Sequence, residues 1–385
     1  MNSEDFSSES TGRLVAIELP RSKVAFMPHP LPRSWQPPIE LWPLIAEARE
    51  SIARLDGIGR YMPNPQLLLR PLQNREALRS SSMEGTYATP EELLLFEAEP
   101  VEPTSDKDRA NEWLEVFNYG RALISGRIGL DEGYPLSLQL IRAMHSELLS
   151  GVRGQDKSPG QFRNVPVQIG HDARFVPPPS YNVEECLYDA EAFLGENLQI
   201  DSLIKAFMLH YQFETIHPFK DGNGRVGRLL LSLQIYRDLN LSNPWVYMSA
   251  FFERYKDEYI NYLYNVSTKG DWQTWLAFCL RGVVEQARDT EKRISSLLEI
   301  KERYIGLINS QSQASARLVQ MVNDLFENPF ISIPRIRDMH GVSYPTAKAD
   351  VERLISLNIL TESRVKVRPK RYLAFEIMAA AYGED

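Results

Sequence analysis

Cysteine and long apolar segments are both scarce in this sequence of 385 residues. Its two cysteines, Cys186 and Cys279, lie far apart, each in an apolar stretch typical of a helix. We therefore expect two buried thiols, and neither a disulfide nor a metal site. No run of about 18 apolar residues occurs that could cross a membrane. Residues 1–30 carry acids and prolines where a signal peptide needs an apolar centre. These absences predict a soluble, cytoplasmic protein without a membrane partner.

Positive charge is also in deficit, since 43 lysines and arginines face 51 acids and give a net charge of −8. This balance argues against a protein whose whole surface binds nucleic acid or membrane. The apolar fraction of 43% supports a compact fold, and a chain of this length is long enough for two or three domains.

Helical periodicity dominates what the sequence does contain. Residues 1–38 are an exception, because serine and many prolines predict an extended arm that packs against the body through Trp35. Glycine, proline and alternating residues predict a short β-hairpin at about 165–177. Asn182 and Glu185 resemble a capping box that starts the helix after it. Apolar residues at helical spacing predict helices within 39–96, with a stretch over 72–83, and at 111–124, 137–149, 182–193, 202–215, 226–239, 251–264 and 272–310.

One run combines several groups that suit a phosphate site: His217-Pro-Phe-Lys-Asp-Gly-Asn-Gly-Arg-Val-Gly-Arg228. Its glycines precede the helix predicted over 226–239, whose first amides lack helical partners and attract anions. Arg225 and Arg228 lie on one helix face and can neutralise phosphate oxygens. Asp221 is a hard oxygen ligand suited to Mg²⁺, and His217 can act as a general base. Each residue alone has an ordinary structural explanation, and we expect Phe219 to be a core anchor. The combination within twelve positions predicts a nucleotide site.

The run resembles the signature of the Fic family, His-x-Phe-x-[Asp/Glu]-Gly-Asn-Gly-Arg-x-x-Arg, and matches it at every defined position. The resemblance extends over about residues 41–280. It implies a mainly α fold, a Fic-type helical bundle whose β-hairpin flap at about 165–177 docks a target protein by strand pairing. It also implies transfer of AMP from ATP to a Tyr, Ser or Thr hydroxyl of a target protein or of the chain itself.

By this resemblance, His217 would be the base that activates the hydroxyl for attack on the α-phosphorus of ATP, and pyrophosphate would leave. Asp221 would hold Mg²⁺ between the α- and β-phosphates. Arg225 would hold the β-phosphate and Arg228 the γ-phosphate. The full set of nucleotide-binding positions would be Gly222, Asn223, Gly224, Arg225, Val226, Gly227 and Arg228, joined by Tyr259.

Two departures within the family bear on the nucleotide. The Doc branch, which resembles a kinase, carries Ala-Asn-Lys where this chain has Gly222-Asn223-Gly224, so the glycine form favours AMP transfer. Many relatives have tandem tyrosines beside the adenine, whereas this chain reads Tyr259-Ile260. The resemblance thus covers the phosphate contacts better than the base contacts.

Upstream, Ser80 and Glu84 fit the family's inhibitory pattern, [Ser/Thr]-x-x-x-Glu-[Gly/Asn]. A carboxylate beside Arg228 would form a charge-assisted pair and occupy the arginine that the γ-phosphate needs. The alternative is an ordinary helix end with Gly85 as its C-terminal glycine. Because the downstream run is present, we interpret Glu84 as an autoinhibitory residue. By the same resemblance, Glu84 could also support removal of AMP from modified targets.

The C-terminal part has a basic excess. The order helix 316–326, helix 333–339, turn, helix 343–357 and strands predicts a winged helix-turn-helix, with its wing at 364–371. Contact with DNA is one option for this module, and dimerisation or docking of a protein partner is the other. Residues 331–373 hold four acids and nine basic residues, Arg335, Arg337, Lys348, Arg353, Arg364, Lys366, Arg368, Lys370 and Arg371.

Two functions therefore compete. The first is a protein adenylyltransferase that uses ATP and Mg²⁺ and is restrained by Glu84. The second is a nucleotide-sensing transcriptional regulator, which needs the phosphate loop but not the base His217. In domain terms we expect an N-terminal arm (1–38), a helical region with the inhibitory helix (39–110), a Fic catalytic core (111–285), a linker helix (286–312) and a winged helix-turn-helix domain (313–385). The family resemblance also allows a homodimer.

Overall fold

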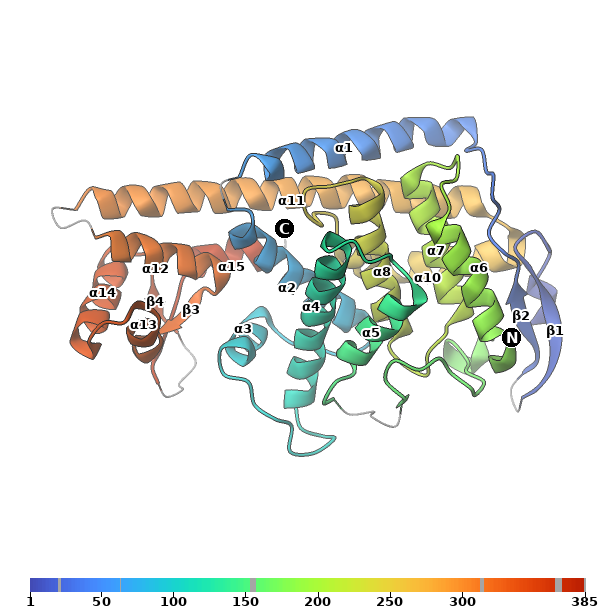
Figure 1. The fold of residues 1–385 in the computed structure, drawn as a ribbon, viewed down its shortest axis with the longest axis horizontal. Helices are drawn as coiled ribbons and strands as arrows, with labels where there is room; N and C mark the ends of the chain where they lie inside the picture. The colour runs from blue at the N-terminus through green and yellow to red at the C-terminus, as the bar shows by residue number, and fades with distance from the viewer. Residues whose placement is uncertain (20–21, 63, 153–156, 312–314, 364–368, 384–385) are drawn as a thin grey trace.

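Helices make up most of the molecule, as the sequence predicts (Figure 1). The computed structural model describes residues 1–19, 22–62, 64–152, 157–311, 315–363 and 369–383. Its α-helices are α1 (Trp42–Arg60), α2 (Gln66–Met83), α3 (Pro90–Ala98), α4 (Ala110–Asp131), α5 (Leu138–Leu148), α6 (Val183–Gly195), α7 (Ser202–Ile216), α8 (Asn223–Asp238), α9 (Ser249–Arg254), α10 (Lys256–Lys269), α11 (Trp272–Asn309), α12 (Ala316–Glu327), α13 (Ile333–His340), α14 (Tyr344–Ser356) and α15 (Phe375–Tyr382).

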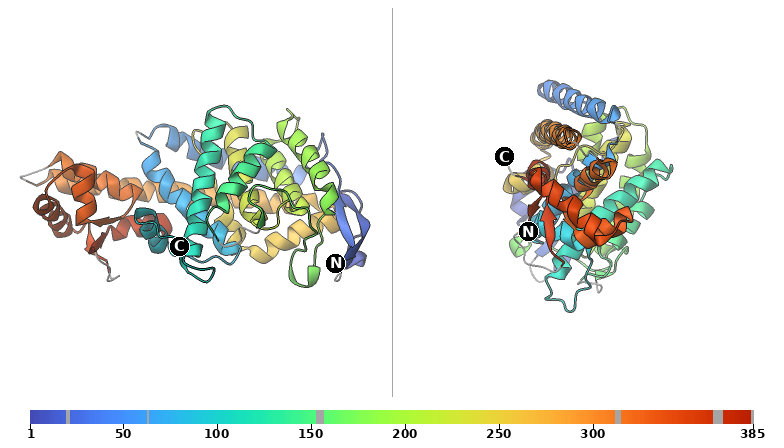
Figure 2. Two further views of the ribbon diagram at one scale, coloured as in Figure 1. Left: turned by 60° about the horizontal axis from the view of Figure 1, so that its bottom comes forward. Right: turned by 90° about the vertical axis from the view of Figure 1, so that its left-hand side faces the viewer.

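Helix α11 is 38 residues long and runs along most of the molecule, with α1 beside it (Figures 1 and 2). The sequence predicts a change from catalytic core to linker at 285–286, but α11 continues through this point without a break. Its buried residues Val283, Ala287, Ile294 and Leu297 follow the spacing of one continuous apolar stripe. The predicted core and linker therefore share a single helix. No helix in the described ranges, α11 included, is long and apolar enough to cross a membrane.

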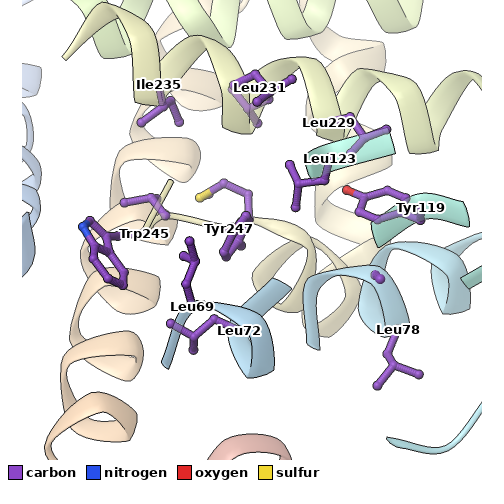
Figure 3. Close-up of a cluster of buried hydrophobic side chains, with 14 of the residues drawn as sticks. Leu69, Leu72, Leu78, Tyr119, Leu123, Leu229, Leu231, Ile235, Trp245 and Tyr247 are labelled. Atoms are coloured by element: carbon purple, nitrogen blue, oxygen red, sulfur yellow. The ribbon is translucent and has the colours of Figure 1, made fainter. Parts of the chain in front are cut away.

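The central core forms where α2, α4 and α8 meet the segment before α9 (Figure 3). Leu72, Leu123 and Leu231 come from the three helices, and Trp245 and Tyr247 from the segment. All five side chains are buried. Each large apolar side chain contributes roughly 1.5–3 kcal/mol by leaving water. This core fixes α2, whose last turn carries Ser80, against α8, which carries Arg228.

The N-terminal region is not the extended arm that its composition suggests. Strands β1 (Gly12–Leu19) and β2 (Ser22–Pro28) form an antiparallel hairpin. Ala25 and Phe26 of this hairpin are buried, Ala25 in a cluster with Val176 and Phe26 against the ring of Phe175. Prolines become frequent only after β2. The alternating residues before them are the strand signal that the prediction of an extended arm overlooked. Trp35 packs against the main core, as predicted.

The predicted flap hairpin is reduced to one isolated β-bridge between Ile169 and Phe175. Pro166 and Pro177 flank the bridge and have no backbone N–H to extend it. The segment gains a different partner, because the N–H of Phe26 in β2 donates to the Val176 carbonyl oxygen at 2.9 Å. The N-terminal hairpin therefore supports the flap from one side.

The start of α6 also differs from expectation. Asn182 precedes α6 but has helical backbone angles, and its side chain makes no capping hydrogen bond to the backbone. Its amide instead donates to the Glu185 carboxylate at 3.2 Å. A short 3₁₀ turn over Ser180–Asn182 leads into the helix, which removes the extended conformation that a capping box requires.

The C-terminal elements follow the predicted order, and the three short strands β3 (Phe330–Ser332), β4 (Thr361–Glu362) and β5 (Arg371–Leu373) form a sheet in the order β3-β5-β4. Residues 364–368, most of the predicted wing, lie outside the described residues. The buried side chains of α12 to α15 belong to the same hydrophobic cluster as the helical body. A separate winged helix-turn-helix domain therefore stays a prediction.

Candidate active site

His217 ends α7 in the left-handed backbone conformation, with φ 49° and ψ 62°. This conformation is costly for a residue other than glycine, so the surroundings must hold it. Its Nδ1 lies 3.3 Å from the Glu214 carbonyl oxygen, which leaves Nε2 as the atom free to meet a substrate. Burial lowers the pKa of His217 to about 4. The imidazole is therefore neutral at physiological pH, as a general base must be.

Arg163 stabilises the strained backbone at His217. Its Nε donates to the His217 carbonyl oxygen at 2.8 Å, and Nη2 donates to Pro178 at 2.7 Å and Ile216 at 3.2 Å. Burial lowers the pKa of this guanidinium to about 10, which still leaves it charged. A cation at the C-terminal carbonyls of α7 also complements the helix dipole. Arg163 thus ties the base to the foot of the flap.

The loop between α7 and α8 is locked by its own side chains. Asn223 accepts from the Phe219 N–H at 2.8 Å and donates to the Phe219 carbonyl at 2.9 Å. Phe219 is fully buried, as expected of a core anchor. Gly222 takes a left-handed conformation with φ 76°, which favours glycine. The Asn223 amide therefore braces the loop, and its expected contact with phosphate oxygens stays a prediction.

His145 of α5 also contacts this loop and fixes its position. The sequence gives no signal of this role. Its Nε2 lies 3.0 Å from the Asp221 carbonyl oxygen, and its Nδ1 accepts from the Gly160 N–H at 2.8 Å. Its ring stacks on Phe219 with centroids 3.7 Å apart. These contacts require a neutral ring protonated at Nε2, and burial lowers the pKa of His145 to about 4.

Helix α8 begins at Asn223, three residues earlier than predicted, so Gly224 and Arg225 lie in its first turn. Arg225 and Arg228 are both almost fully buried. Arg225 lies 3.3 Å from the Glu115 carboxylate of α4 and 3.6 Å from that of Asp221. The two arginines therefore belong to the interior of the site and are not solvated surface groups.

Arg228 is held by the two residues of the inhibitory pattern. Its Nε donates to the Ser80 hydroxyl at 2.8 Å, and its Nη2 donates to the Ser80 carbonyl at 2.9 Å and to the Glu84 carboxylate at 2.8 Å. Burial alone would raise the pKa of Glu84, but Arg228 outweighs this effect and lowers it. The structure thus brings together the three side chains of the predicted brake.

The Glu84 carboxylate also lies against the first turn of α8. A Cβ placed on Gly224 would come within 2.2 Å of Glu84 Oε1, so only glycine permits this approach. A carboxylate is a small stand-in for a phosphate, because both are anions that accept N–H bonds. Its position places an anion beside the first turn of α8, where Arg228 binds it.

The pocket around these groups extends from Arg228 to the flap. Its volume is about 220 Å³, below the roughly 300–1,000 Å³ usual for ligand pockets. Glu84 lines this small pocket beside Gly224 and Arg228. Apolar side chains in the lining include Ile169 and Phe175 from the flap and Ile260 and Leu263 from α10.

Tyr259 lines this pocket but is buried, and its hydroxyl lies 2.9 Å from His210 Nε2. Glu214 of α7 also lines this pocket, and no motif in the sequence indicates it. Burial raises the pKa of Glu214 to about 7. One of its carboxylate oxygens is buried and has no hydrogen-bond partner among the described residues. Glu214 lies against Gly227, where a Cβ would come within 2.2 Å of that oxygen.

Asp221 is the candidate metal ligand of the loop. One of its oxygens accepts from the Gly222 N–H at 2.7 Å, and about half of its side chain, 46%, is exposed. A single carboxylate that faces solvent suits Mg²⁺, which usually takes one or two carboxylates together with substrate phosphates. No cluster of three or more metal-ligating side chains occurs within the described ranges. Cys186 and Cys279 are buried free thiols, as predicted.

Parts of this chain match known protein families. Residues 42–127 match the family model described as Fic/DOC family N-terminal, and residues 135–235 match the one described as Fic/DOC family. A probable protein adenylyltransferase of Aquifex aeolicus is 41% identical over 85 residues, which are 21% of this chain and 27% of that protein. The protein adenylyltransferase fic-1 of Caenorhabditis elegans is 36% identical over 104 residues, 26% of this chain and 20% of its own length. The chain spans less than half the length of the curated relatives it matches.

Solved structures show the same fold. A Fic family protein from Desulfovibrio desulfuricans G20 has a TM-score of 0.54 and 21% identity, with 88% of this chain and 98% of that chain covered. Fic-1 from C. elegans has a TM-score of 0.53 and 21% identity, with 67% of this chain and 74% of that chain covered. The matched residues contain the whole loop from His217 to Arg228. Residues 135–235 therefore form a domain of the Fic/DOC family, and distant homologues of the chain are named protein adenylyltransferases.

Proposed function

We propose that this protein is a protein adenylyltransferase that moves AMP from ATP to a Tyr, Ser or Thr hydroxyl of a target protein or of itself. One observation carries the proposal: a neutral histidine stands in one pocket with the first turn of α8 and with a buried arginine, Arg228, that already binds a carboxylate. A base beside a phosphate cradle is what transfer to a hydroxyl requires.

In the proposed step, the target oxygen attacks the α-phosphorus while His217 Nε2 takes the hydroxyl proton. The bond between the α-phosphorus and its bridging oxygen breaks, and pyrophosphate leaves with the electron pair. Arg228 would bind the γ-phosphate in place of Glu84, and the first-turn amides of α8 would bind the β-phosphate. Arg225 would add charge to the β-phosphate. These groups act by position and charge neutralisation.

Asp221 would hold Mg²⁺, which supplies charge neutralisation at the α- and β-phosphates when bound. The partial exposure of its carboxylate supports this assignment. The target segment would pair with the flap edge at Val165–Ile169, because the opposite side of the flap is supported by β2.

Glu84 would act as the brake of this enzyme. It occupies Arg228 and the space above Gly224, so ATP cannot place its γ-phosphate there while the pair persists. The same carboxylate could also assist removal of AMP, and the relief of inhibition would come from whatever displaces α2.

The regulator alternative rests on basic residues at the C-terminus. Of the six that the structure describes, four are paired with carboxylates: Arg337 with Asp338, Lys348 with Glu352, Lys370 with Glu362 and Arg371 with Glu99. Paired cations attract DNA phosphates less than unpaired ones. This arrangement favours the enzyme over a DNA-binding regulator.

The proposal is tested by mass spectrometry of the purified protein and a lysate after incubation with ATP and Mg²⁺. We expect a mass increase of one AMP on a hydroxyl side chain, stronger in Glu84→Gly and absent in Glu84→Gly with His217→Ala. ATP binding that persists in both variants without any labelling would instead support a nucleotide sensor.

A further inference from the structure

A second cavity lies behind the inhibitory helix, between α2, α9 and α11. Its volume is about 670 Å³, within the range of small-molecule sites. It shares no lining residue with the nucleotide pocket. Six cationic side chains line it against three carboxylates, Glu253, Glu285 and Asp289; the six are Arg75, Arg79, Arg254, Arg288, Lys292 and Arg293. The cavity therefore has an excess of positive charge in a protein that is acidic as a whole.

The floor of the cavity concentrates this charge. Arg75 and Arg293 share one carboxylate, Asp289, at 2.9 and 3.0 Å. Burial lowers the pKa of Arg75, and the guanidinium groups of Arg293 and Arg79 lower it further. The Arg75 Nε is buried and has no hydrogen-bond partner among the described residues. Arg75 thus keeps one donor without a partner and lies beside two further arginines, Arg79 and Arg293, whose repulsion an anion in the cavity would relieve.

The rim carries cations that an incoming anion can recruit. Arg254 pairs with Glu285 at 2.6 Å, and Arg288 pairs with Glu47 of α1 at 2.8 Å. Both arginines are more than half exposed. Exposed pairs of this kind contribute little to stability, so exchange of a carboxylate for a more highly charged anion costs little.

We propose that this cavity is a second ligand site, which binds a small anion that carries phosphate groups. Guanidinium groups match phosphate oxygens through parallel N–H bonds, and several arginines around one cavity suit a group with two or more negative charges. The evidence for this site does not rest on the transfer reaction proposed above.

The position of the cavity gives the ligand a route to the brake. Arg79 pairs with Glu253 of α9 at 3.1 Å, and the Ser82 hydroxyl donates to the same carboxylate. Both residues lie on the last turns of α2, beside Ser80 and Glu84. A phosphate on Arg79 therefore competes with Glu253 for the contact that ties this end of α2 to α9.

The test is calorimetric titration of the full-length protein with inorganic pyrophosphate in the absence of Mg²⁺. Arg228→Gln removes the arginine of the nucleotide pocket, and Arg79→Gln with Arg254→Gln removes two partly exposed arginines of the second cavity. Arg54→Gln is the matched control, since Arg54 is an exposed arginine that pairs with Glu291 of α11 outside the cavity. We expect wild type, Arg228→Gln and Arg54→Gln to bind pyrophosphate with the same affinity. The affinity of the double variant should be lower by a factor of about ten or more.

Several outcomes would overturn the proposal. They are no binding to wild type, loss in Arg228→Gln with full binding in the double variant, or equal weakening by Arg54→Gln. Citrate that binds as tightly as pyrophosphate would also overturn it, because phosphate would then not be the recognised group.

ADP, titrated into Arg228→Gln, separates a nucleotide source of the phosphate from free pyrophosphate. A crystal soaked with pyrophosphate should show density between Arg75 and Arg79, and density confined to the Gly224 turn would contradict the site.

Discussion

The loop of residues 217–228 and the C-terminal residues 331–373 both gather basic side chains, but they hold them in different ways. In the loop, Arg228 is buried and bound by Ser80 and Glu84, which come from a distant helix. At the C-terminus, Lys348 is exposed and pairs with Glu352 one turn away. A buried cation must be compensated by partners from elsewhere in the fold, so its presence indicates function more strongly than a count of exposed charges does.

Substitution of the base should have the largest effect. We expect His217→Ala, made in the Glu84→Gly background, to lower the rate of AMP incorporation by about 10²–10⁴-fold, because the hydroxyl proton then has no acceptor. Quantitative labelling with radioactive ATP measures the rate. His340→Ala is the control, since His340 lies in the C-terminal part and pairs with Asp324. Undiminished AMP incorporation by the His217→Ala variant would show that this loop is not catalytic.

Arg163→Gln should destabilise the protein strongly. The variant leaves the carbonyls of Ile216, His217 and Pro178 without their charged donor, a loss of about 3 kcal/mol in the free energy of unfolding. Urea unfolding followed by circular dichroism provides the measurement. An unchanged midpoint would mean that the left-handed backbone of His217 does not depend on this brace.

Release of the brake should raise activity. Glu84→Gly removes a charge-assisted bond of about 1.5–3 kcal/mol, so productive ATP binding, and with it AMP incorporation, should rise about ten- to a hundredfold. Glu99→Gly is the matched control, because Glu99 pairs with Arg371 away from the pocket. Equal activity of Glu84→Gly and wild type would show that the contact with Arg228 does not inhibit.

The pH dependence tests the state of the base. Burial lowers the pKa of His217 to about 4 from 6.5, and the Glu84 carboxylate works in the opposite direction. A lowered histidine pKa keeps the ring neutral at every pH above it, so in Glu84→Gly the loss of activity on acidification should set in near pH 4. The value of kcat/KM between pH 5 and 8 decides the matter. A decline centred near pH 6.5 would place the ring in water.

The smallest effect is expected at the C-terminus. Lys348→Ala should change the free energy of unfolding by less than about 0.5 kcal/mol, since both members of its ion pair are more than half exposed. Thermal or urea unfolding beside Arg163→Gln gives the contrast directly. A large loss of stability would show that the C-terminal charges are structural in the same sense as those of the loop.

The parts that the sequence predicts well are those whose signals are local. The glycines, the arginines and His217 lie within twelve positions, and helix geometry alone places Arg225 and Arg228 beside the helix start. The pairing of Glu84 with Arg228 spans many residues and could be predicted only through the family resemblance.

Other features depend on contacts between distant elements and carry little sequence signal. Glu115 and His145 approach the loop from α4 and α5, and neither stands out in its own helix. The N-terminal hairpin was not predicted because the prolines after it suggested an extended arm. The flap has only one β-bridge because Pro166 and Pro177 cannot donate backbone hydrogen bonds. The long α11, by contrast, follows the helix predicted over 272–310, because its apolar stripe continues past residue 285.

The most direct test of the central claim is a crystal structure of Glu84→Gly with an ATP analogue and Mg²⁺. We expect the γ-phosphate on Arg228, the β-phosphate at the Gly224 turn, and the α-phosphorus facing His217 Nε2 with Asp221 on the metal. A pocket without nucleotide, or a triphosphate that avoids Arg228, would contradict it.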